Sequence, residues 1–245
     1  MSGAAEYSLG DIALFAELAP QQRQAIEQQT SFQRYGAGEQ IIDRNSPTRD
    51  LFCVVRGSVR VVIHAPSGRD VSFEDIDAGG HFGELACVDG EPRSASVVAM
   101  LTTVVARIPP DALHQVLLDH PRLALALLRR MATVLRHATD RILDLSTLGA
   151  NNRIYADLLR RAKPNPKLGP KAGVIYPIPT HQDLAGRVSV TRETVTRALG
   201  DLARADVVVK DGARLVVPDM EKLLDMVTRF RTDVVVNKSD IGWFL

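Results

Sequence analysis

Two oppositely charged side chains, Glu84 and Arg93, stand in a turn-rich stretch of this 245-residue chain. Phe82-Gly83 can end a strand and Glu84 can open a helical turn, whose free backbone N–H groups attract anions. Arg93 offers a planar fork of donors that suits phosphate oxygens, whereas Glu84 accepts hydrogen bonds and suits a sugar hydroxyl. Together these residue types predict a binding site for a sugar phosphate.

The elements around this stretch have the pattern of short strands. Between residues 31 and 108, turn residues interrupt the chain at regular intervals, which favours an antiparallel barrel or jelly roll. Residues 50–63 predict two strands on either side of Gly57, with Val59, Val61 and Ile63 alternating toward one face. Short helices are expected ahead of this region, over residues 9–29.

Both patterns resemble cyclic-nucleotide-binding domains. The run Phe-Gly-Glu-Leu-Ala from residue 82, followed by Pro-Arg-Ser-Ala from residue 92, is similar to the phosphate-binding cassette of these domains. Residues 50–63 are similar to part of their barrel. The resemblance implies that a cyclic nucleotide contacts Gly83, Glu84, Leu85, Arg93, Ser94 and Ala95. Related kinases that prefer cyclic AMP carry Ala at the position of Ser94 and those that prefer cyclic GMP carry Thr, so cyclic AMP is favoured and cyclic GMP stays open.

A long helix is predicted after the strands, from Pro121 to about residue 148. Its small and apolar residues alternate four and three positions apart, which is a heptad seam. A helix of about 28 residues extends about 42 Å, more than a small barrel covers. We therefore expect the seam to pair with a second copy in a homodimer, with packing on the chain's own barrel as the alternative. The seam consists of Ala124, Leu128, Met131, Leu135, Ala138, Ile142, Leu145 and Gly149.

The region after this helix is basic. Residues 150–217 carry 12 basic and 6 acidic side chains (+6), whereas residues 1–149 carry 14 and 18 (−4), which suggests that residues 150–217 bind a polyanion. Thr180 can cap a helix that ends near Val188, and a second helix follows from Thr191. An Asp-Gly turn at residue 211 predicts a hairpin, so that the whole is a winged helix-turn-helix.

The second of these helices carries side chains that can read DNA. Recognition helices contact base edges near their N-terminus: arginine suits guanine and glutamate suits cytosine. We expect Arg192, Glu193 and Arg197 to read bases, with Thr196 on the same exposed face. Contacts to phosphate are expected from Thr180, Gln182 and Thr191.

Residues 191–199, Thr-Arg-Glu-Thr-Val-Thr-Arg-Ala-Leu, resemble the recognition helix of the Crp/Fnr family of bacterial transcription regulators, and the resemblance extends over about residues 10–217. It implies a palindromic DNA site with TGTGA-like half-sites and a nucleotide that touches the long helix. Counting back from Arg153 places the purine contact on Thr139, beside Ala138, and a second register would place it on Val134 and Leu135. The chain departs from the family at Ser189, where a glycine is usual.

We therefore predict an α+β protein of four segments: a cyclic-nucleotide-binding β-barrel or jelly-roll domain (1–120), a dimerisation helix and hinge (121–149), a winged helix-turn-helix (150–217) and a C-terminal helix and tail (218–245). The scattered histidines and two separated cysteines predict neither an enzyme nor a metal or prosthetic group. Without a long apolar run or a signal peptide, a cytoplasmic protein is expected, and RNA polymerase is a candidate partner. The alternatives are a regulator of the same family that senses another small molecule or a redox signal, and a cyclic-nucleotide module that acts on a protein partner.

Overall fold

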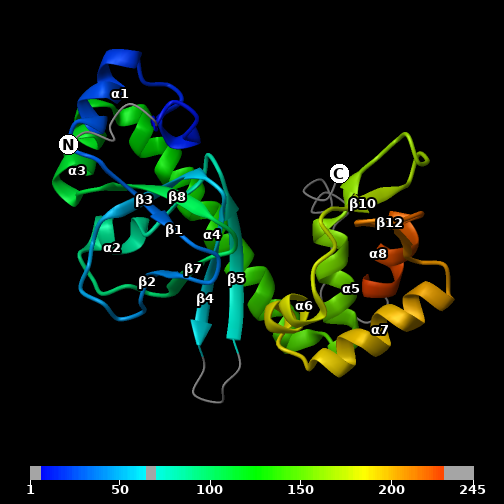
Figure 1. Cartoon of the computed structure of the whole chain (residues 1–245). Helices are drawn as coiled ribbons and strands as arrows, with labels where there is room; N and C mark the ends of the chain where they lie inside the picture. Colours follow the sequence, from blue (N-terminus) through cyan, green and yellow to red (C-terminus); the bar gives the residue numbers. More distant parts are fainter. Residues whose placement is uncertain (1–6, 65–69, 229–245) are drawn as a thin grey trace. The chain divides into compact units, whose positions relative to one another are not determined.

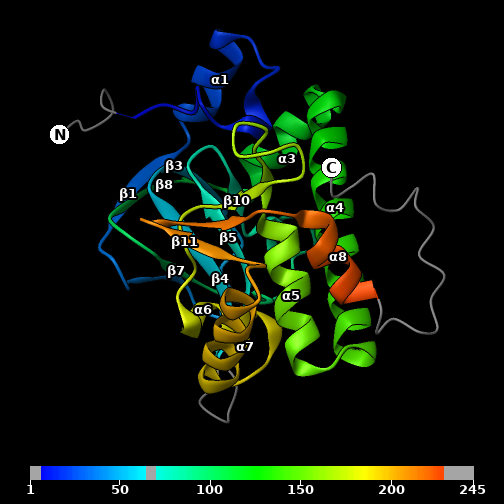
Figure 2. The same ribbon diagram turned by 90° about the vertical axis from the view of Figure 1, so that its right-hand side faces the viewer.

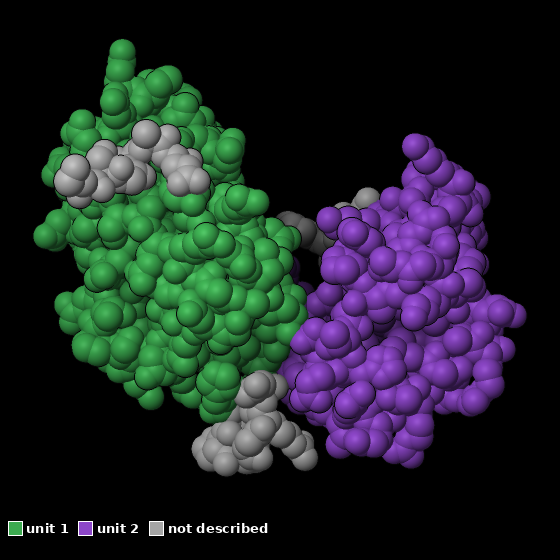
Figure 3. Space-filling model, viewed as in Figure 1, with its two compact units in different colours: residues 1–135 green, residues 136–245 purple. Residues whose placement is uncertain are grey.

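The computed structural model describes residues 7–64 and 70–228 of the chain (Figure 1). The chain folds into two compact units, residues 1–135 and 136–245 (Figure 3). The long helix α4 (Pro121–Thr147) contributes residues to both units. The segment boundaries expected at residues 120, 149 and 217 stay predictions.

Short antiparallel strands form the centre of the first unit, as the turn spacing predicts. Among the described residues they make two four-stranded sheets, with strand orders β1-β8-β3-β6 and β2-β7-β4-β5. A core between the strands contains Phe52, Val54, Val59, Phe82 and Val105. This double sheet confirms the expected antiparallel jelly roll. The strands are β1 (Ser31–Tyr35), β2 (Gln40–Ile42), β3 (Leu51–Arg56), β4 (Ser58–His64), β5 (Asp70–Asp77), β6 (His81–Phe82), β7 (Ser96–Ala99) and β8 (Thr103–Ile108).

The two strands on either side of Gly57 form as expected, but they join different sheets. β3 pairs with β6 and β8, whereas β4 pairs with β5 and β7. Val59 lies in the core between the strands and Val61 packs on it, as the alternation predicts, whereas Ile63 is only half-buried and Val62 between them is also buried. The pairing of β4 with β5 shifts register between Val61 and Val62. Val61 pairs with Glu74 and Val62 with Ser72, so the extra residue of this bulge, Phe73, belongs to β5, while the pairing of β4 with β7 continues without a shift.

Helices cover one sheet of the first unit and share a second apolar core with it. This core joins Phe15, Ile26, Leu113 and Leu127 to Cys53 on β3. Proline is the first residue of three of these helices. It suits this position because the backbone N–H that proline lacks would have no partner within the helix there. The helices are η1 (Ala13–Phe15), α1 (Pro20–Glu27), α2 (Glu84–Asp89), α3 (Pro110–Asp119) and the first part of α4.

The long helix α4 ends within one residue of the predicted position. Its side facing the first unit buries Leu123 and Leu127. The heptad residues Leu128, Leu135 and Ile142 are 60%, 68% and 65% exposed, and Leu145 is 43% exposed. The described residues of a single chain therefore leave the seam largely uncovered. No helix in the described part of the chain is both long and apolar enough to cross a membrane.

The second unit is a helix-turn-helix with a hairpin and one further helix. Helices α5, α6 and α7 pack on one another (Figure 2) around Ile154, Leu158, Leu184, Val195 and Leu202. A small sheet has the strand order β11-β12-β10-β9, in which β11 and β12 form the expected hairpin. The elements are α5 (Ala150–Arg161), β9 (Lys163–Pro164), β10 (Gly173–Ile175), α6 (His181–Val188), α7 (Arg192–Arg204), β11 (Val209–Asp211), β12 (Arg214–Val217) and α8 (Met220–Thr228).

Helix α8 explains the amphipathic pattern that follows residue 218. Met220, Leu223 and Val227 are buried in the core of the second unit, where α8 packs on α5. The expected C-terminal helix is thereby present. The rest of the expected tail, residues 229–245 with its apolar end at 241–245, lies outside the described residues.

Candidate functional site

The cassette begins where β6 ends and the chain turns into α2. Gly83 takes the left-handed conformation, with φ of 79°, and precedes Glu84, the first residue of α2. A Cβ atom on Gly83 would lie 2.6 Å from Nη1 of Arg93 and 3.2 Å from the carbonyl oxygen of Asp50. Both the backbone angle and the close approach therefore require glycine.

Arg93 is turned into the protein and is only 2% exposed. Its guanidinium donates hydrogen bonds to the hydroxyl of Thr48 (3.1 Å) and to the carbonyl oxygens of Gly83 (2.9 Å) and Asp50 (2.7 Å). The guanidinium carbon also lies 5.5 Å from the centre of the Phe52 ring. Burial lowers the pKa of Arg93, and the nearby Asp50 opposes this effect. Three of the five N–H donors of this side chain are therefore bound within the protein.

Glu84 lies among charges from two other elements. Burial raises the pKa of its carboxyl, while its own backbone N–H and the guanidinium of Arg130 act in the opposite direction. Arg130, on α4, forms an ion pair of 2.5 Å with Glu74 on β5. The sequence did not reveal this grouping, because Glu74 and Arg130 are 56 residues apart and neither belongs to the cassette motif.

His81 lies just before the cassette and is 8% exposed. Its Nε2 atom is buried without a hydrogen-bond partner among the described residues. Burial and the nearby Arg130 lower the pKa of His81 to about 4. The ring is therefore held neutral at ordinary pH, which no motif in the sequence indicated.

The other expected nucleotide contacts differ in exposure. Ser94 is exposed, Leu85 is 38% exposed and Ala95 is half-buried. Thr139 is exposed on α4, within the residues of the second unit. Its approach to the purine stays a prediction.

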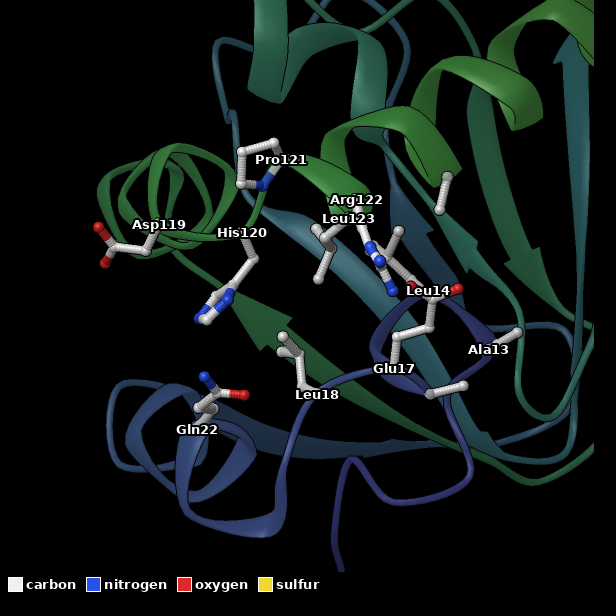
Figure 4. A pocket seen from close by; sticks show the side chains of 12 residues that line it. Ala13, Leu14, Glu17, Leu18, Gln22, Asp119, His120, Pro121, Arg122 and Leu123 are labelled. Atoms are coloured by element: carbon white, nitrogen blue, oxygen red, sulfur yellow. The ribbon is translucent and has the colours of Figure 1, made fainter.

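A pocket of about 640 Å³ lies in the first unit, away from the cassette residues. Figure 4 shows His120 and Gln22 facing one another across it, with Leu18 and Leu123 toward its interior. A smaller pocket of about 270 Å³ shares Gln22, Asp119 and His120 with it. These pockets lie between the N-terminal helices and the junction of α3 with α4.

The expected DNA contacts all lie on the surface of the second unit. The threonines cap the two helices: the hydroxyl of Thr180 accepts from the N–H of Asp183 (3.1 Å), and that of Thr191 accepts from the N–H of Thr194 (3.2 Å). Each cap fixes the first turn of its helix. The exposed set is Thr180, Gln182, Thr191, Arg192, Glu193, Thr196 and Arg197.

The recognition helix α7 presents its charged residues opposite a buried face. Val195, Ala198 and Leu202 are buried, so the first turns expose Arg192, Glu193 and Arg197. Hydrogen bonds from its own N–H and from Thr191 lower the pKa of Glu193. This carboxylate is therefore charged and able to accept hydrogen bonds from a base.

The turn between α6 and α7 is fixed by an arginine that the sequence did not single out as functional. Ser189 has φ of 55°, the left-handed conformation expected where the family usually has glycine. Arg153, on α5, donates to the carbonyl oxygens of Val188 (2.9 Å) and Ser189 (3.4 Å) in this turn. It also donates to Leu148 (3.0 Å), just after α4. One side chain thus joins the end of the long helix to the helix-turn-helix.

Both cysteines are buried in the first unit. Burial raises the pKa of the Cys53 thiol above its ordinary range and that of the Cys87 thiol to about 11. Neither thiol is therefore readily ionised, and two thiolates would be fewer than the four that iron–sulfur clusters ordinarily use. The described residues contain no group of three or more His, Cys, Asp or Glu arranged to hold a metal ion.

A sheet domain with a nucleotide cassette, followed by a helix-turn-helix, defines a Crp-like transcription regulator that binds cyclic nucleotides. The comparisons agree: residues 32–120 match the cyclic nucleotide-binding domain family, and residues 152–226 match the Crp-like helix-turn-helix domain family. The chain belongs to the Crp/Fnr family of transcription regulators, which are not enzymes.

A curated relative is the CRP-like cAMP-activated global transcriptional regulator of Mycobacterium tuberculosis, 26% identical over 88% of this chain and 96% of the relative. Among solved structures, a CooA mutant from Carboxydothermus hydrogenoformans has a TM-score of 0.71 and 18% identity over 82% of this chain and 88% of that one. The c-di-GMP responsive regulator CLP of Xanthomonas campestris has a TM-score of 0.64 and 21% identity, over 78% and 94%. These two structures show the shared fold.

Proposed function

We propose that this protein is a homodimeric transcription regulator that responds to cyclic AMP, or to cyclic GMP, and binds a palindromic DNA site with TGTGA-like half-sites. The observation that carries the proposal is the presence, in one chain, of a Glu84–Arg93 cassette and an exposed recognition helix with Arg192, Glu193 and Arg197. A relative of similar length is named for activation by cAMP.

The nucleotide site would use the contacts expected from the cassette. The ribose hydroxyl donates to Glu84, and the cyclic phosphate takes bonds from Arg93, Ser94 and the N–H groups at Gly83, Leu85 and Ala95. Arg93 keeps two N–H donors for a phosphate, but because the side chain is only 2% exposed, the phosphate reaches them only when the surrounding segments move. Binding therefore shifts the segment that Arg93 holds, which includes Thr48 and Asp50. This movement links the ligand to the conformation of the protein.

The dimer would form along the exposed seam of α4. Leu128, Leu135 and Ile142 lie seven residues apart and are each at least 60% exposed. A second copy of the same helix covers such a stripe with its own stripe. In the dimer, Thr139 would approach the purine of the bound nucleotide, as the family resemblance implies.

The second unit would read DNA with α7 in the major groove. Arg192 and Arg197 suit guanine, Glu193 suits cytosine, and Thr180, Gln182 and Thr191 set the register on the phosphates. Because its partner would be chromosomal DNA, we place the protein in the cytoplasm. RNA polymerase is the partner expected of a bound activator.

The test is a titration of a duplex carrying inverted TGTGA half-sites, followed by fluorescence anisotropy, with cyclic AMP, with cyclic GMP and with neither. Tighter binding with one cyclic nucleotide supports the proposal, and equal affinity under all conditions contradicts the ligand response. The Arg192→Ala variant should bind more weakly by about 1–3 kcal/mol. If it binds equally well, the DNA assignment is wrong and a module that acts on a protein partner is favoured.

A second candidate differs only in the effector. The internal bonds of Arg93 and the presence of Ala138 beside Thr139 favour a regulator with another small molecule as its ligand. One structural neighbour is described as responsive to c-di-GMP. Calorimetry with cyclic AMP, cyclic GMP and c-di-GMP decides between the two candidates, because only one of them predicts heat from a monomeric cyclic nucleotide.

A further inference from the structure

A histidine at the start of α6 is bonded to the recognition helix. Nδ1 of His181 lies 2.8 Å from the hydroxyl oxygen of Thr196 on α7. The same hydroxyl lies 3.0 Å from the carbonyl oxygen of Arg192, one helical turn earlier, and donates to it. His181 is half-buried, whereas Thr196 and Arg192 are exposed on the face expected to read DNA.

The hydrogen bonds of the Thr196 hydroxyl determine which nitrogen of the neutral His181 ring carries the hydrogen. A threonine hydroxyl has a single hydrogen, and in Thr196 it points to the Arg192 carbonyl. Thr196 must then accept a proton from His181, which assigns the hydrogen of the neutral ring to Nδ1. Nε2 of the neutral ring holds only a lone pair and becomes a donor when the ring takes up a second proton.

Resting on the proposed function, we propose that His181 is a further DNA-contacting residue, whose Nε2 donates to a backbone phosphate in the imidazolium form, so that operator binding takes up protons. A phosphate oxygen only accepts hydrogen bonds, and its charge repels the lone pair of a neutral imidazole. The expected phosphate contacts Thr180 and Gln182 are the neighbours of His181 in the sequence. Thr196, whose hydroxyl is already bonded on both sides, is then a positioning residue and does not read a base.

Most charged side chains of the helices that pack on α6 are bonded to other groups. Helices α5 and α7 make the main contacts with α6. On α5, Arg153 is bonded to carbonyls at the far end of α6, and Asp157 is paired with Arg161. On α7, Arg204 is paired with Asp201. On α4, Asp144 is paired with Arg160 of α5, and Arg141 donates to the carbonyl oxygen of Gly186. The charges at the His181 end are Asp183, Arg192, Glu193 and Arg197.

The experiment measures the affinity for the operator by fluorescence anisotropy, at constant ionic strength and with saturating cyclic nucleotide. The pH is varied between about pH 6 and pH 8, the range in which histidine changes charge. We expect the affinity of the unaltered protein to rise several-fold as the pH falls. In His181→Gln this rise should be lost, with weak binding throughout. In His181→Arg, whose charge does not titrate, binding should be tight at every pH. The control His64→Gln, on β4 of the first unit, should keep the unaltered pH profile.

The outcomes separate the inference from the function on which it rests. If the unaltered protein binds the operator equally tightly at both pH values, or if His181→Gln keeps the pH dependence, the inference is overturned and the proposed function stands. If no variant binds the operator, the proposed function is wrong and the inference with it. NMR of the imidazole nitrogens gives an independent check: at neutral pH the hydrogen of free His181 should be on Nδ1, and a hydrogen on Nε2 would overturn the inference.

Discussion

The guanidinium of Arg93 donates a hydrogen bond of 2.7 Å to the backbone carbonyl oxygen of Asp50. The carboxylate of Asp50 in turn pairs with Arg107 on β8, at 2.8 Å. Asp50 therefore connects the cassette to the sheet through its backbone and to β8 through its side chain. A phosphate that drew Arg93 away from this carbonyl would loosen the segment that leads into β3. Ligand binding would in this way change the conformation of the sheet domain.

Replacing Arg93 with lysine tests whether one side chain serves both the fold and the ligand. Lysine keeps the charge but cannot make three directed bonds from one plane. We expect the free energy of unfolding to fall by about 1–3 kcal/mol, because buried carbonyls lose their partners, and the nucleotide affinity to fall at least about tenfold. Urea denaturation and calorimetry with cyclic AMP measure the two effects.

The matched variant for this test is Thr48→Val, which removes one acceptor of Arg93 and leaves the guanidinium in place. It should cost about 1 kcal/mol of stability while the nucleotide binds as tightly as before or more tightly. Nucleotide binding by Arg93→Lys at the unaltered affinity would show that Arg93 is structural only.

Gly83 and Gly200 should respond to alanine with opposite signs. Gly83→Ala meets a left-handed backbone and the 2.6 Å approach of Arg93, so we expect a loss of at least about 1 kcal/mol and weaker nucleotide binding. Gly200 lies within α7 with nothing within 4 Å of its added Cβ. Gly200→Ala should therefore stabilise the protein, by up to about 1 kcal/mol. Thermal unfolding of both variants makes the comparison, and equal destabilisation would contradict it.

The parts of the fold that could be predicted from sequence are those that local patterns determine. Turn residues marked the strand ends, Pro121 marked the start of α4, and Thr180 and Thr191 marked the two helix caps. The bulge in β5 could not be predicted, because it depends on how Glu74 and Ser72 pair with β4.

The residues of the candidate site could be predicted from the sequence, but most of their contacts could not. The motif identified Glu84 and Arg93, but it could not show that Arg93 is bonded inward, since its partner Asp50 is 43 residues away. The Glu74–Arg130 pair and the bond between His181 and Thr196 likewise join segments that are separate in sequence. Interactions of this kind follow from the folded arrangement and leave no periodic signal in the sequence.

A charge on the α4 seam should prevent formation of the proposed dimer. Leu135→Asp places two carboxylates against each other in a paired seam, where neither finds a partner. We expect a monomer in sedimentation equilibrium and loss of operator binding. The control is Leu168→Asp, which lies outside the seam on a residue that is 43% exposed. A dimer that survives Leu135→Asp would show that another surface holds the two copies together.

Arg153 lies on α5 and not on the recognition helix α7, but we expect its loss to weaken DNA binding. Arg153→Ala leaves the carbonyls of Leu148, Val188 and Ser189 without their donor. We expect a loss of about 2–4 kcal/mol in stability, faster amide exchange in the turn between α6 and α7, and weaker operator binding. The control Arg204→Ala breaks an exposed pair with Asp201, which should change stability by less than about 1 kcal/mol. Unaltered exchange in the turn of Arg153→Ala would contradict this role.

His81 should make the first unit sensitive to acid. The folded protein holds the pKa of His81 at about 4, against an ordinary value of 6.5. As the pH falls below 6.5, the unfolded chain takes up a proton that the folded chain refuses until about pH 4, so the free energy of unfolding falls by up to about 3 kcal/mol. Glu84 has a raised pKa and acts in the opposite direction: its contribution favours the folded state at low pH and is lost as the pH rises through its folded pKa.

His81→Phe removes the histidine contribution alone, so the midpoint of urea unfolding should fall less between about pH 7 and pH 5 than in the unaltered protein. The control His64→Phe replaces an exposed histidine on β4 and should keep the full acid sensitivity, and a His81→Phe variant that keeps it too would show that His81 is not its source.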